Sequence, residues 1–394
     1  MRMGRERRTA LPPQACARDD AAGAVQALPS AAAHELGLAY PCGDAPGTGE
    51  GRRVAPGVQW LRLPLPGTLG HINLWAVQEE GGWAVFDCGM STPDCMAAWR
   101  ALLAPDGPLG GRPPTRLIAT HMHSDHVGLA GWLHREYGCE LWMTRGEYLQ
   151  ARLNLADGQR AAPPEALAFQ RRAGWDAAQV EEFGRRFGSM GRVMAPLPET
   201  YRRVQDGQRL RIGAHDWHVV VGSGHSPEHA SFHCPALGLL VSGDQVLPLI
   251  SSNVSAGFAE PLADPMAEWL DALAKVARTV PDDVLVLPAH DEPFHGLHAR
   301  VRALADRRHD ALDRLREALQ EAPLRAVDTL HALFGRKRFA DPTTFKLATG
   351  EAVAYLSHLL ARGEIAVADD AQGVAWYRAA AQSPPDTPSK ETEA

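Results

Sequence analysis

Cysteine is scarce in this 394-residue sequence: there are six, scattered along the chain with no CxxC pair. Such spacing indicates free thiols in a reducing compartment and argues against a disulfide framework. Long apolar runs are missing too, since no stretch approaches the roughly 18 uninterrupted apolar residues of a membrane helix. The basic residues at the start of the chain are not followed by the apolar segment of a signal peptide. We therefore expect a cytoplasmic protein with no membrane span.

Positive charge is in deficit, with 40 Lys and Arg against 47 Asp and Glu, so the net charge is −7. This balance argues against a protein coated in basic patches for nucleic acid, although it allows local patches. The hydrophobic content of 45% is enough to bury a sizeable core and excludes wholesale disorder. We predict four segments: a poorly ordered leader at 1–53, a main domain at 54–300 with a helical insertion at 144–200, a winged-helix-like domain at 301–380, and a loose tail at 381–394.

Five short apolar runs in the main domain are typical of buried strands, because each is rich in apolar side chains and is bounded by Gly, Pro or a polar residue. They occupy residues 83–86, 117–120, 217–221, 239–242 and 284–287. Each run leads to a polar side chain or a candidate metal ligand. Functional loops at one end of buried strands are usual in layered α/β domains. The sequence therefore predicts an α/β fold with its functional site at the strand ends.

Histidine is concentrated after the second of these strands. The segment from His121 to His126 contains four candidate ligands, which are His121, His123, Asp125 and His126. Imidazole and carboxylate groups suit zinc and similar first-row metals. In a turn, alternate positions let His121 and His123 face one way and the other two face another, which suits two neighbouring metals. Three more candidates each follow a later strand: His225, Asp244 and His290.

This ordered set resembles the metallo-β-lactamase-fold hydrolase superfamily, over about residues 58–295. The resemblance implies a four-layer αββα sandwich with a catalytic metal centre at one edge. It implies two divalent metal ions, which we expect to be zinc, with iron or manganese as alternatives. By position, one metal would be bound by His121, His123 and His225, the other by Asp125, His126 and His290, and Asp244 would bridge them. Asp87 matches a recurrent position that supports the histidine loop.

The C-terminal segment carries a second resemblance. Three predicted helices and a hairpin at 301–380 form a winged-helix pattern. Residues 349–352 (Thr-Gly-Glu-Ala) and 354–356 (Ala-Tyr-Leu) resemble the extra domain of the subgroup that includes human β-lactamase-like protein 2.

Two neighbouring metals can hold a hydroxide between them at neutral pH and polarise a carbonyl or phosphoryl oxygen, so no serine or cysteine nucleophile is required. Asp125 is our candidate catalytic residue, as the acceptor of a proton from the bridging water. We expect a small-molecule ester, thioester or lactone as substrate. The alternative is phosphodiester hydrolysis of RNA or DNA, but the third predicted helix, at 352–362, has few basic side chains for phosphate contacts. The sequence leaves the oligomeric state open, a homodimer included.

Seven further residues are candidates for contacts around the metals or the substrate: Asp87, His229, Asp291, His71, Asn73, Ser252 and Asn253. His229 and Asp291 flank candidate ligands, and metal-bound histidines usually donate their other N–H to a partner. Segments 71–73 and 251–253 could line the pocket.

The insertion at 144–200 has two interpretations. Its apolar residues, such as Phe183 and Phe187, could cover the metal edge or could pack as ordinary core. Its arginines at 171, 172, 185, 186 and 192 could meet an anionic substrate or could form a solvated face.

Overall fold

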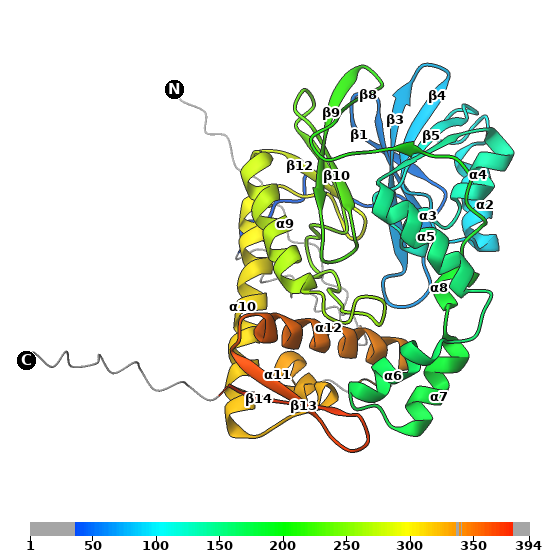
Figure 1. Ribbon diagram of the computed structural model, residues 1–394. Coiled ribbons are helices and arrows are strands. Elements are labelled where there is room, and N and C mark those ends of the chain that lie inside the picture. Colours follow the sequence, from blue (N-terminus) through cyan, green and yellow to red (C-terminus); the bar gives the residue numbers. More distant parts are fainter. Residues whose placement is uncertain (1–35, 336–338, 340, 381–394) are drawn as a thin grey trace, which may run out of the picture.

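Two mixed β-sheets pack face to face at the centre of the molecule (Figure 1). The computed structural model describes residues 36–335, 339 and 341–380. The strands of the first sheet, in spatial order, are β1 (Gly51–Ala55), β2 (Val58–Pro64), β3 (His71–Glu79), β4 (Gly82–Phe86), β5 (Pro114–Ile118), β6 (Glu140–Met143) and β7 (Arg202–Arg203). Those of the second are β12 (Leu285–Pro288), β11 (Leu239–Gly243), β10 (His229–Cys234), β9 (His215–Gly222) and β8 (Arg209–Ile212).

Parallel and antiparallel pairs occur in both sheets. Strands β1 to β4 pair antiparallel, and β4 to β7 pair parallel. In the second sheet only β11 and β12 are parallel. The parallel pairs β4–β5 and β11–β12 bring the carboxyl ends of four strands to the region of the candidate ligands. All five strands predicted from the sequence are present.

Alternate side chains of each strand face opposite sides of its sheet, one toward the other sheet and one toward the covering helices, so the domain has four layers. On β3, Trp75 and Val77 point into the core between the sheets, while Leu74 and Ala76 pack on the outer face. That outer face is covered by helices α2 (Pro93–Leu102), α4 (Ala130–Tyr137) and α5 (Arg145–Asp157). The outer face of the second sheet is covered by α9 (Pro265–Thr279) and α10 (Leu297–Glu321). The predicted αββα order of layers is therefore observed.

The C-terminal segment follows the predicted order of helices and hairpin. After α10 come η1 (Ala326–Thr329), α11 (Leu330–Phe334), α12 (Pro342–Ala361) and the hairpin of β13 (Ile365–Asp369) and β14 (Ala375–Ala379). Helix α12 begins where Asp341 accepts a hydrogen bond from the Thr344 N–H at 2.7 Å, with proline in its first turn. Figure 1 shows α12 running beneath the sandwich. The winged-helix designation stays a prediction. The predicted boundary between the main and the C-terminal domain, at residue 300, lies inside α10.

The insertion packs against this C-terminal segment. Its helices are α6 (Pro164–Arg172), α7 (Ala177–Arg186) and α8 (Ser189–Arg192), in addition to α5. The ring of Trp175, between α6 and α7, lies 4.9 Å from that of Phe345 on α12 and 6.0 Å from that of Phe183. Phe183 and Phe187 are buried in the core shared with α12. Core packing is thus the correct interpretation of these two phenylalanines.

The ends of the predicted segments fall partly outside the described residues. Of the predicted leader, residues 1–35 lie outside them, and so does the predicted tail at 381–394. Within 36–53, Leu38 is buried, and Ala39 pairs with His295. Cys42, Cys88, Cys95, Cys139 and Cys234, the cysteines that the structure describes, are free thiols, as predicted. In the same part of the chain, no helix has both the length and the apolar character needed to cross a membrane.

Candidate metal centre

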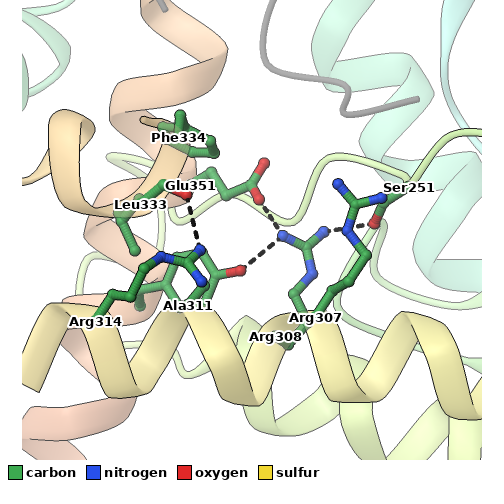
Figure 2. Close-up of a pocket in the computed structure, with 9 residues that line it drawn as sticks. Ser251, Arg307, Arg308, Ala311, Arg314, Leu333, Phe334 and Glu351 are labelled. Carbon is green, nitrogen blue, oxygen red and sulfur yellow. Dashed lines mark hydrogen bonds and ion pairs between the residues drawn. The ribbon is translucent and has the colours of Figure 1, made fainter. Parts of the chain in front are cut away.

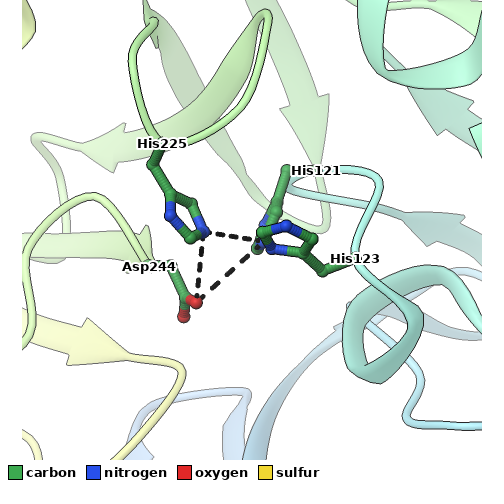
Figure 3. A group of neighbouring side chains, drawn as sticks. All are labelled: His121, His123, His225 and Asp244. Atoms are coloured by element: carbon green, nitrogen blue, oxygen red, sulfur yellow. Dashed lines mark hydrogen bonds and ion pairs between the residues drawn. The ribbon is translucent and has the colours of Figure 1, made fainter. Parts of the chain in front are cut away.

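Seven imidazole and carboxylate side chains meet at one edge of the sandwich, all of them predicted from the sequence. The first group comprises His121, His123, His225 and Asp244, and the second comprises Asp125, His126 and His290. Figure 3 shows the first group converging from three separate segments. The turn after β5 and the short helix α3 (Ser124–Val127) carry the histidine-rich run, and the other three residues follow β9, β11 and β12.

Asp244 lies between the two groups, with one carboxylate oxygen toward each. Its Oδ2 is 3.5 Å from His225 Nε2 and 4.0 Å from His121 Nε2. Its Oδ1 is 3.6 Å from His126 Nε2 and 3.5 Å from His290 Nε2. The structure therefore places this side chain where a bridging carboxylate would stand.

The spacing of the donor atoms fits metal coordination. Ligand atoms about 2.1 Å from a tetrahedral ion lie about 3.4 Å apart. In the second group, Asp125 Oδ2 is 3.4 Å from His126 Nε2 and 3.5 Å from His290 Nε2. His126 Nε2 and Asp244 Oδ1 are buried, and neither has a hydrogen-bond partner in the described structure. Because unpaired buried polar atoms are costly, these two fit a site that would hold a divalent cation.

The electrostatics of the site also favour a cation. Burial, and then the neighbouring His126, lower the pKa of His121 well below its usual range, so this imidazole is neutral. Burial would raise the pKa of Asp244, but His126 and His290 bring it well below its usual range. Burial would lower the pKa of His126, but Asp125 and the other nearby carboxylates raise it well above its usual range. Metal binding requires ionised carboxylates and neutral imidazoles. The carboxylates favour a positive charge at His126, and a bound cation would supply that charge in place of the His126 proton.

Four of the candidate histidines are oriented through their Nδ1 atoms, which leaves Nε2 facing the centre. The partners are Thr120 Oγ1 for His121 at 3.0 Å, Asp87 Oδ2 for His126 at 2.8 Å, the Asn253 carbonyl for His225 at 2.7 Å, and the His71 carbonyl for His290 at 3.0 Å. Such partners fix the tautomer and the ring direction of a metal-binding histidine. His123 differs, because its Nδ1 lies 2.8 Å from His121 Nε2, toward the centre.

Asp87 is a buried carboxylate that holds the histidine run in place, the role that the resemblance to the superfamily implied for this position. Besides His126, it accepts hydrogen bonds from the Thr120 N–H at 2.8 Å and the Thr120 hydroxyl at 3.0 Å. Its φ of 61° lies in the left-handed region, which aspartate and asparagine tolerate better than most residues.

We expect the Asp87→Asn variant to bind metal at the His126 group about 10–100-fold more weakly, a usual cost of changing such a partner. Asparagine keeps the size and the tolerance of the left-handed backbone but removes the charge facing His126 Nδ1. Competition with a chromogenic chelator measures the affinity, and exposed Asp94→Asn on α2 is the control. Equal zinc affinities in the two variants would contradict this role.

His229 and Asp291 lie behind the candidate ligands. The Asp244 N–H donates to His229 Nε2 at 3.1 Å. A Cβ atom on Gly243, whose φ is 52°, would come within 2.6 Å of the same nitrogen, so glycine permits this close approach. The Asp291 N–H donates to His71 Nε2 at 3.2 Å. His229 thus holds the backbone of Asp244, and the backbone of Asp291 fixes the turn after His290.

The structure corrects the prediction that Asn73 lines the pocket. Its amide nitrogen donates to the carbonyls of Pro288 at 3.0 Å and Asp291 at 2.6 Å. Its Oδ1 accepts from Trp60 Nε1 at 2.8 Å and Arg62 Nε at 3.1 Å. Because its hydrogen-bonding capacity is used within the protein and it is 1% exposed, Asn73 holds the β12 turn instead of meeting substrate. His71 supports the same turn through its carbonyl and Nε2.

Of the two roles predicted for Ser252 and Asn253, contact with the metal surroundings or with the substrate, the structure shows the first. Ser252 is buried and donates its hydroxyl to the Asp244 carbonyl. Asn253 holds His225 through its carbonyl oxygen, as described above. Both therefore support candidate ligands from behind.

Glu147 on α5 is a structural residue of the site that the sequence analysis missed. It is fully buried, and its Oε2 accepts from the Met122 N–H, inside the histidine run, at 2.8 Å. Its Oε1 accepts from the Glu228 N–H at 2.7 Å and the Ser226 hydroxyl at 2.6 Å. Glu147 thus ties the turn after β5 to the turn that carries His225. No motif distinguishes it from a solvent-facing glutamate on a helix.

Three of the five arginines named in the insertion match the prediction of a solvated face. Arg185 pairs with Glu181 at 2.6 Å and with Glu182 at 2.7 Å, and Arg186 pairs with Glu182 at 2.6 Å. Arg172 pairs with Asp369 of β13 at 3.1 Å. Because these charges are balanced by neighbouring carboxylates, the structure does not favour them as a binding surface for an anionic substrate.

The fold and the two ligand groups together define a mixed α/β protein with a candidate metal centre at the edge of its sandwich. Residues 67–290, more than half of the chain, match the Metallo-beta-lactamase superfamily. Residues 312–380 match the family described as Metallo-beta-lactamase-like, C-terminal domain. The chain therefore belongs to the metallo-β-lactamase superfamily and is a metallo-hydrolase of that superfamily, which confirms the resemblance and the fold predicted from the sequence.

Individual relatives agree with this assignment. A beta-lactamase domain protein from Burkholderia ambifaria is 37% identical with a TM-score of 0.80, covering 89% of this chain and 100% of that one. The metallo-beta-lactamase family protein TTHA1429 from Thermus thermophilus, 22% identical with a TM-score of 0.67, covers 83% of this chain and 100% of that one and shows the same fold. The probable metallo-hydrolase YqjP of Bacillus subtilis (strain 168) is 21% identical over 277 residues, which are 70% of this chain and 84% of that protein.

Proposed function

We propose that the protein is a binuclear zinc hydrolase that cleaves an ester, thioester or lactone bond in a small molecule. The placement of Asp244 carries the proposal, because its two oxygens face separate groups of candidate ligands. A single metal would need only one of these groups. The ligand set is made of imidazoles and carboxylates, which suit zinc, with iron and manganese as the alternatives. The free thiols fit a reducing compartment such as the cytoplasm.

Two bound metal ions supply a nucleophile from water at neutral pH and polarise the oxygen of the scissile group. The chain's own residues would accept the proton and hold the candidate ligands in place. Asp125 is our candidate proton acceptor: its side chain keeps 15% exposure, compared with 11% for Asp244 and 3% for Asp87. Of these three carboxylates it is thus the most accessible to water and substrate. Asp87, His71 and Thr120 hold the imidazole rings in place.

The burial of α12 favours a small-molecule substrate over nucleic acid. Residues 348–356 of this helix, the third of the predicted winged helix, are all buried. The helix contacts α9 of the sandwich as well as α7 and α11. A recognition helix must offer an exposed face, with basic groups, to a groove of the nucleic acid. Helix α12 offers neither over these residues.

A panel of substrates tests the proposal. The zinc-loaded protein is assayed with p-nitrophenyl esters, acyl-thioesters, lactones and bis-p-nitrophenyl phosphate. We expect the highest kcat/KM on one of the acyl substrates, and its loss on removal of the metal with a chelator and return on adding zinc. A dominant activity on the phosphodiester would contradict the proposed bond specificity.

A further inference from the structure

The segment from Ser251 to Asn253, here called the 251–253 segment, lies between the candidate metal centre and the C-terminal helices. It follows β11 and has no helical or strand conformation. Its position therefore depends on hydrogen bonds made by side chains and by its own carbonyls, not on a backbone ladder.

One side of the 251–253 segment holds two candidate ligands. The Asn253 carbonyl accepts from His225 Nδ1 at 2.7 Å, and the Ser252 hydroxyl donates to the Asp244 carbonyl. A shift of this segment would therefore turn the His225 ring and move the backbone of Asp244. These two residues belong to the first ligand group, and Asp244 also faces the second.

The other side of the segment is held by Arg308 of α10 and Glu351 of α12. The Arg308 guanidinium donates to the Ser252 carbonyl at 2.8 Å and to Ser251 Oγ at 2.9 Å. The Asn253 amide donates to Glu351 Oε2 at 2.9 Å. Arg308 and Glu351 also form an ion pair with each other, and Figure 2 shows this pair together with the Arg308–Ser251 contact.

This ion pair is enclosed and closely packed. The side chains of Arg308 and Glu351 are 7% and 2% exposed. The cavity beside them, drawn in Figure 2, has a volume of about 20 Å³, room for about one water molecule. Burial would lower the pKa of Arg308, but Glu351 and Tyr355 raise it above its usual range, so the guanidinium is charged. Tyr355 also accepts a hydrogen bond from it at 2.9 Å.

A buried ion pair is a poor source of stability, because desolvation offsets the attraction and apolar residues of similar size often serve as well. What apolar residues cannot supply is the set of hydrogen bonds to Ser251, Ser252 and Asn253. We propose that Arg308 and Glu351 are positioning residues of the metal centre: through the 251–253 segment they set the places of His225 and Asp244. The C-terminal helices are then part of the metal-binding apparatus. This inference rests on the proposed function only in requiring that the centre binds metal.

The test compares zinc affinity with stability in three variants. Glu351→Gln removes the charge and one acceptor oxygen. The double variant Arg308→Met/Glu351→Met replaces the ion pair with apolar side chains and avoids an unpaired buried charge. The control is Thr349→Val, because Thr349 is equally buried on α12 but bonds to Trp175 Nε1 at 3.1 Å, away from the 251–253 segment. Zinc affinity is measured by chelator competition, and thermal unfolding is measured on the metal-free proteins.

We expect Glu351→Gln and the double variant to bind zinc about 10–100-fold more weakly than the wild type, the usual range for changed partners of metal ligands. Thr349→Val should keep the wild-type zinc affinity even if its unfolding temperature falls. Wild-type zinc affinity in a folded double variant would overturn the inference, and so would an equal loss of affinity in Thr349→Val. If Glu351→Gln alone fails to fold, the double variant decides.

This experiment separates the inference from the proposed function, because it uses no substrate. A wild-type protein that takes up no zinc would overturn the proposed function, and this inference with it. Zinc uptake by the wild type with no acyl hydrolysis would contradict the proposed reaction and leave the positioning role to be decided by the variants.

Discussion

The Asp244→Ala variant is expected to lose at least about three orders of magnitude in kcat/KM. The carboxylate of Asp244 faces His225 with one oxygen and His290 with the other, at 3.5 Å in both cases. Its removal deprives both candidate metals of a ligand. Bound metals provide several kcal/mol of charge stabilisation in the transition state, and each 1.4 kcal/mol is about tenfold in rate. Steady-state kinetics on the best acyl substrate and metal analysis of the same sample measure the effect.

The matched control is Asp216→Ala, since Asp216 is an exposed aspartate on β9 that pairs with Arg211 at 3.1 Å. It should keep both its metal and its activity. If Asp244→Ala retained the wild-type metal content and rate, Asp244 would not bridge two metals, and the binuclear site would have to be abandoned.

The Asp125→Asn variant tests the proton acceptor separately from the ligand. Asparagine keeps an oxygen that can coordinate the metal but cannot accept a proton at neutral pH. We expect kcat to fall about 10²–10⁴-fold, the usual contribution of a general base, while the zinc-saturated variant keeps most of its metal. Asp125→Ala should lose turnover and also metal, with the fold intact by circular dichroism.

Near-normal turnover in zinc-saturated Asp125→Asn would contradict the assignment of Asp125 as proton acceptor. A loss of rate that excess zinc restores would assign Asp125 to metal binding alone. Both outcomes are read from the same titration of activity against added zinc.

The candidate ligands could be located from sequence because strand ends have a local signature. Short apolar runs such as 117–120 and 239–242 indicate buried strands, and the residues directly after them meet at one edge of the sheets. The alternation of His121 and His123 with Asp125 and His126 also predicted two groups, and the structure separates the side chains in that way. Alternation along the chain and position after a buried strand are thus sufficient to locate ligands whose place depends on the local backbone.

The supporting residues could not be placed with the same success, because their roles depend on contacts between distant segments. Asn73 lies 215 residues from Pro288 in the chain, yet its side-chain amide donates to the carbonyls of Pro288 and Asp291. Glu147 is one of several glutamates on helices, and only the folded arrangement brings it to Met122 and Ser226. Hydrogen bonds of this kind leave no periodic signal in a sequence. The sequence therefore located the ligands and misjudged part of their surroundings.

The C-terminal segment shows the same limit. The order of helices and hairpin followed from apolar periodicity, but the burial of α12 against the sandwich and the insertion did not. The most important consequence is the hydrogen bond from Asn253 to Glu351. Because Asn253 also holds the candidate ligand His225, a single residue connects α12 to the candidate metal centre.

Metal content per folded chain is the most direct test of the central claim. The wild-type protein is saturated with zinc, freed of excess by gel filtration, and analysed by inductively coupled plasma mass spectrometry against protein concentration. Two candidate ligand groups that share Asp244 predict two zinc ions per chain. One ion or none, in a protein that is folded and active, would contradict a binuclear zinc hydrolase.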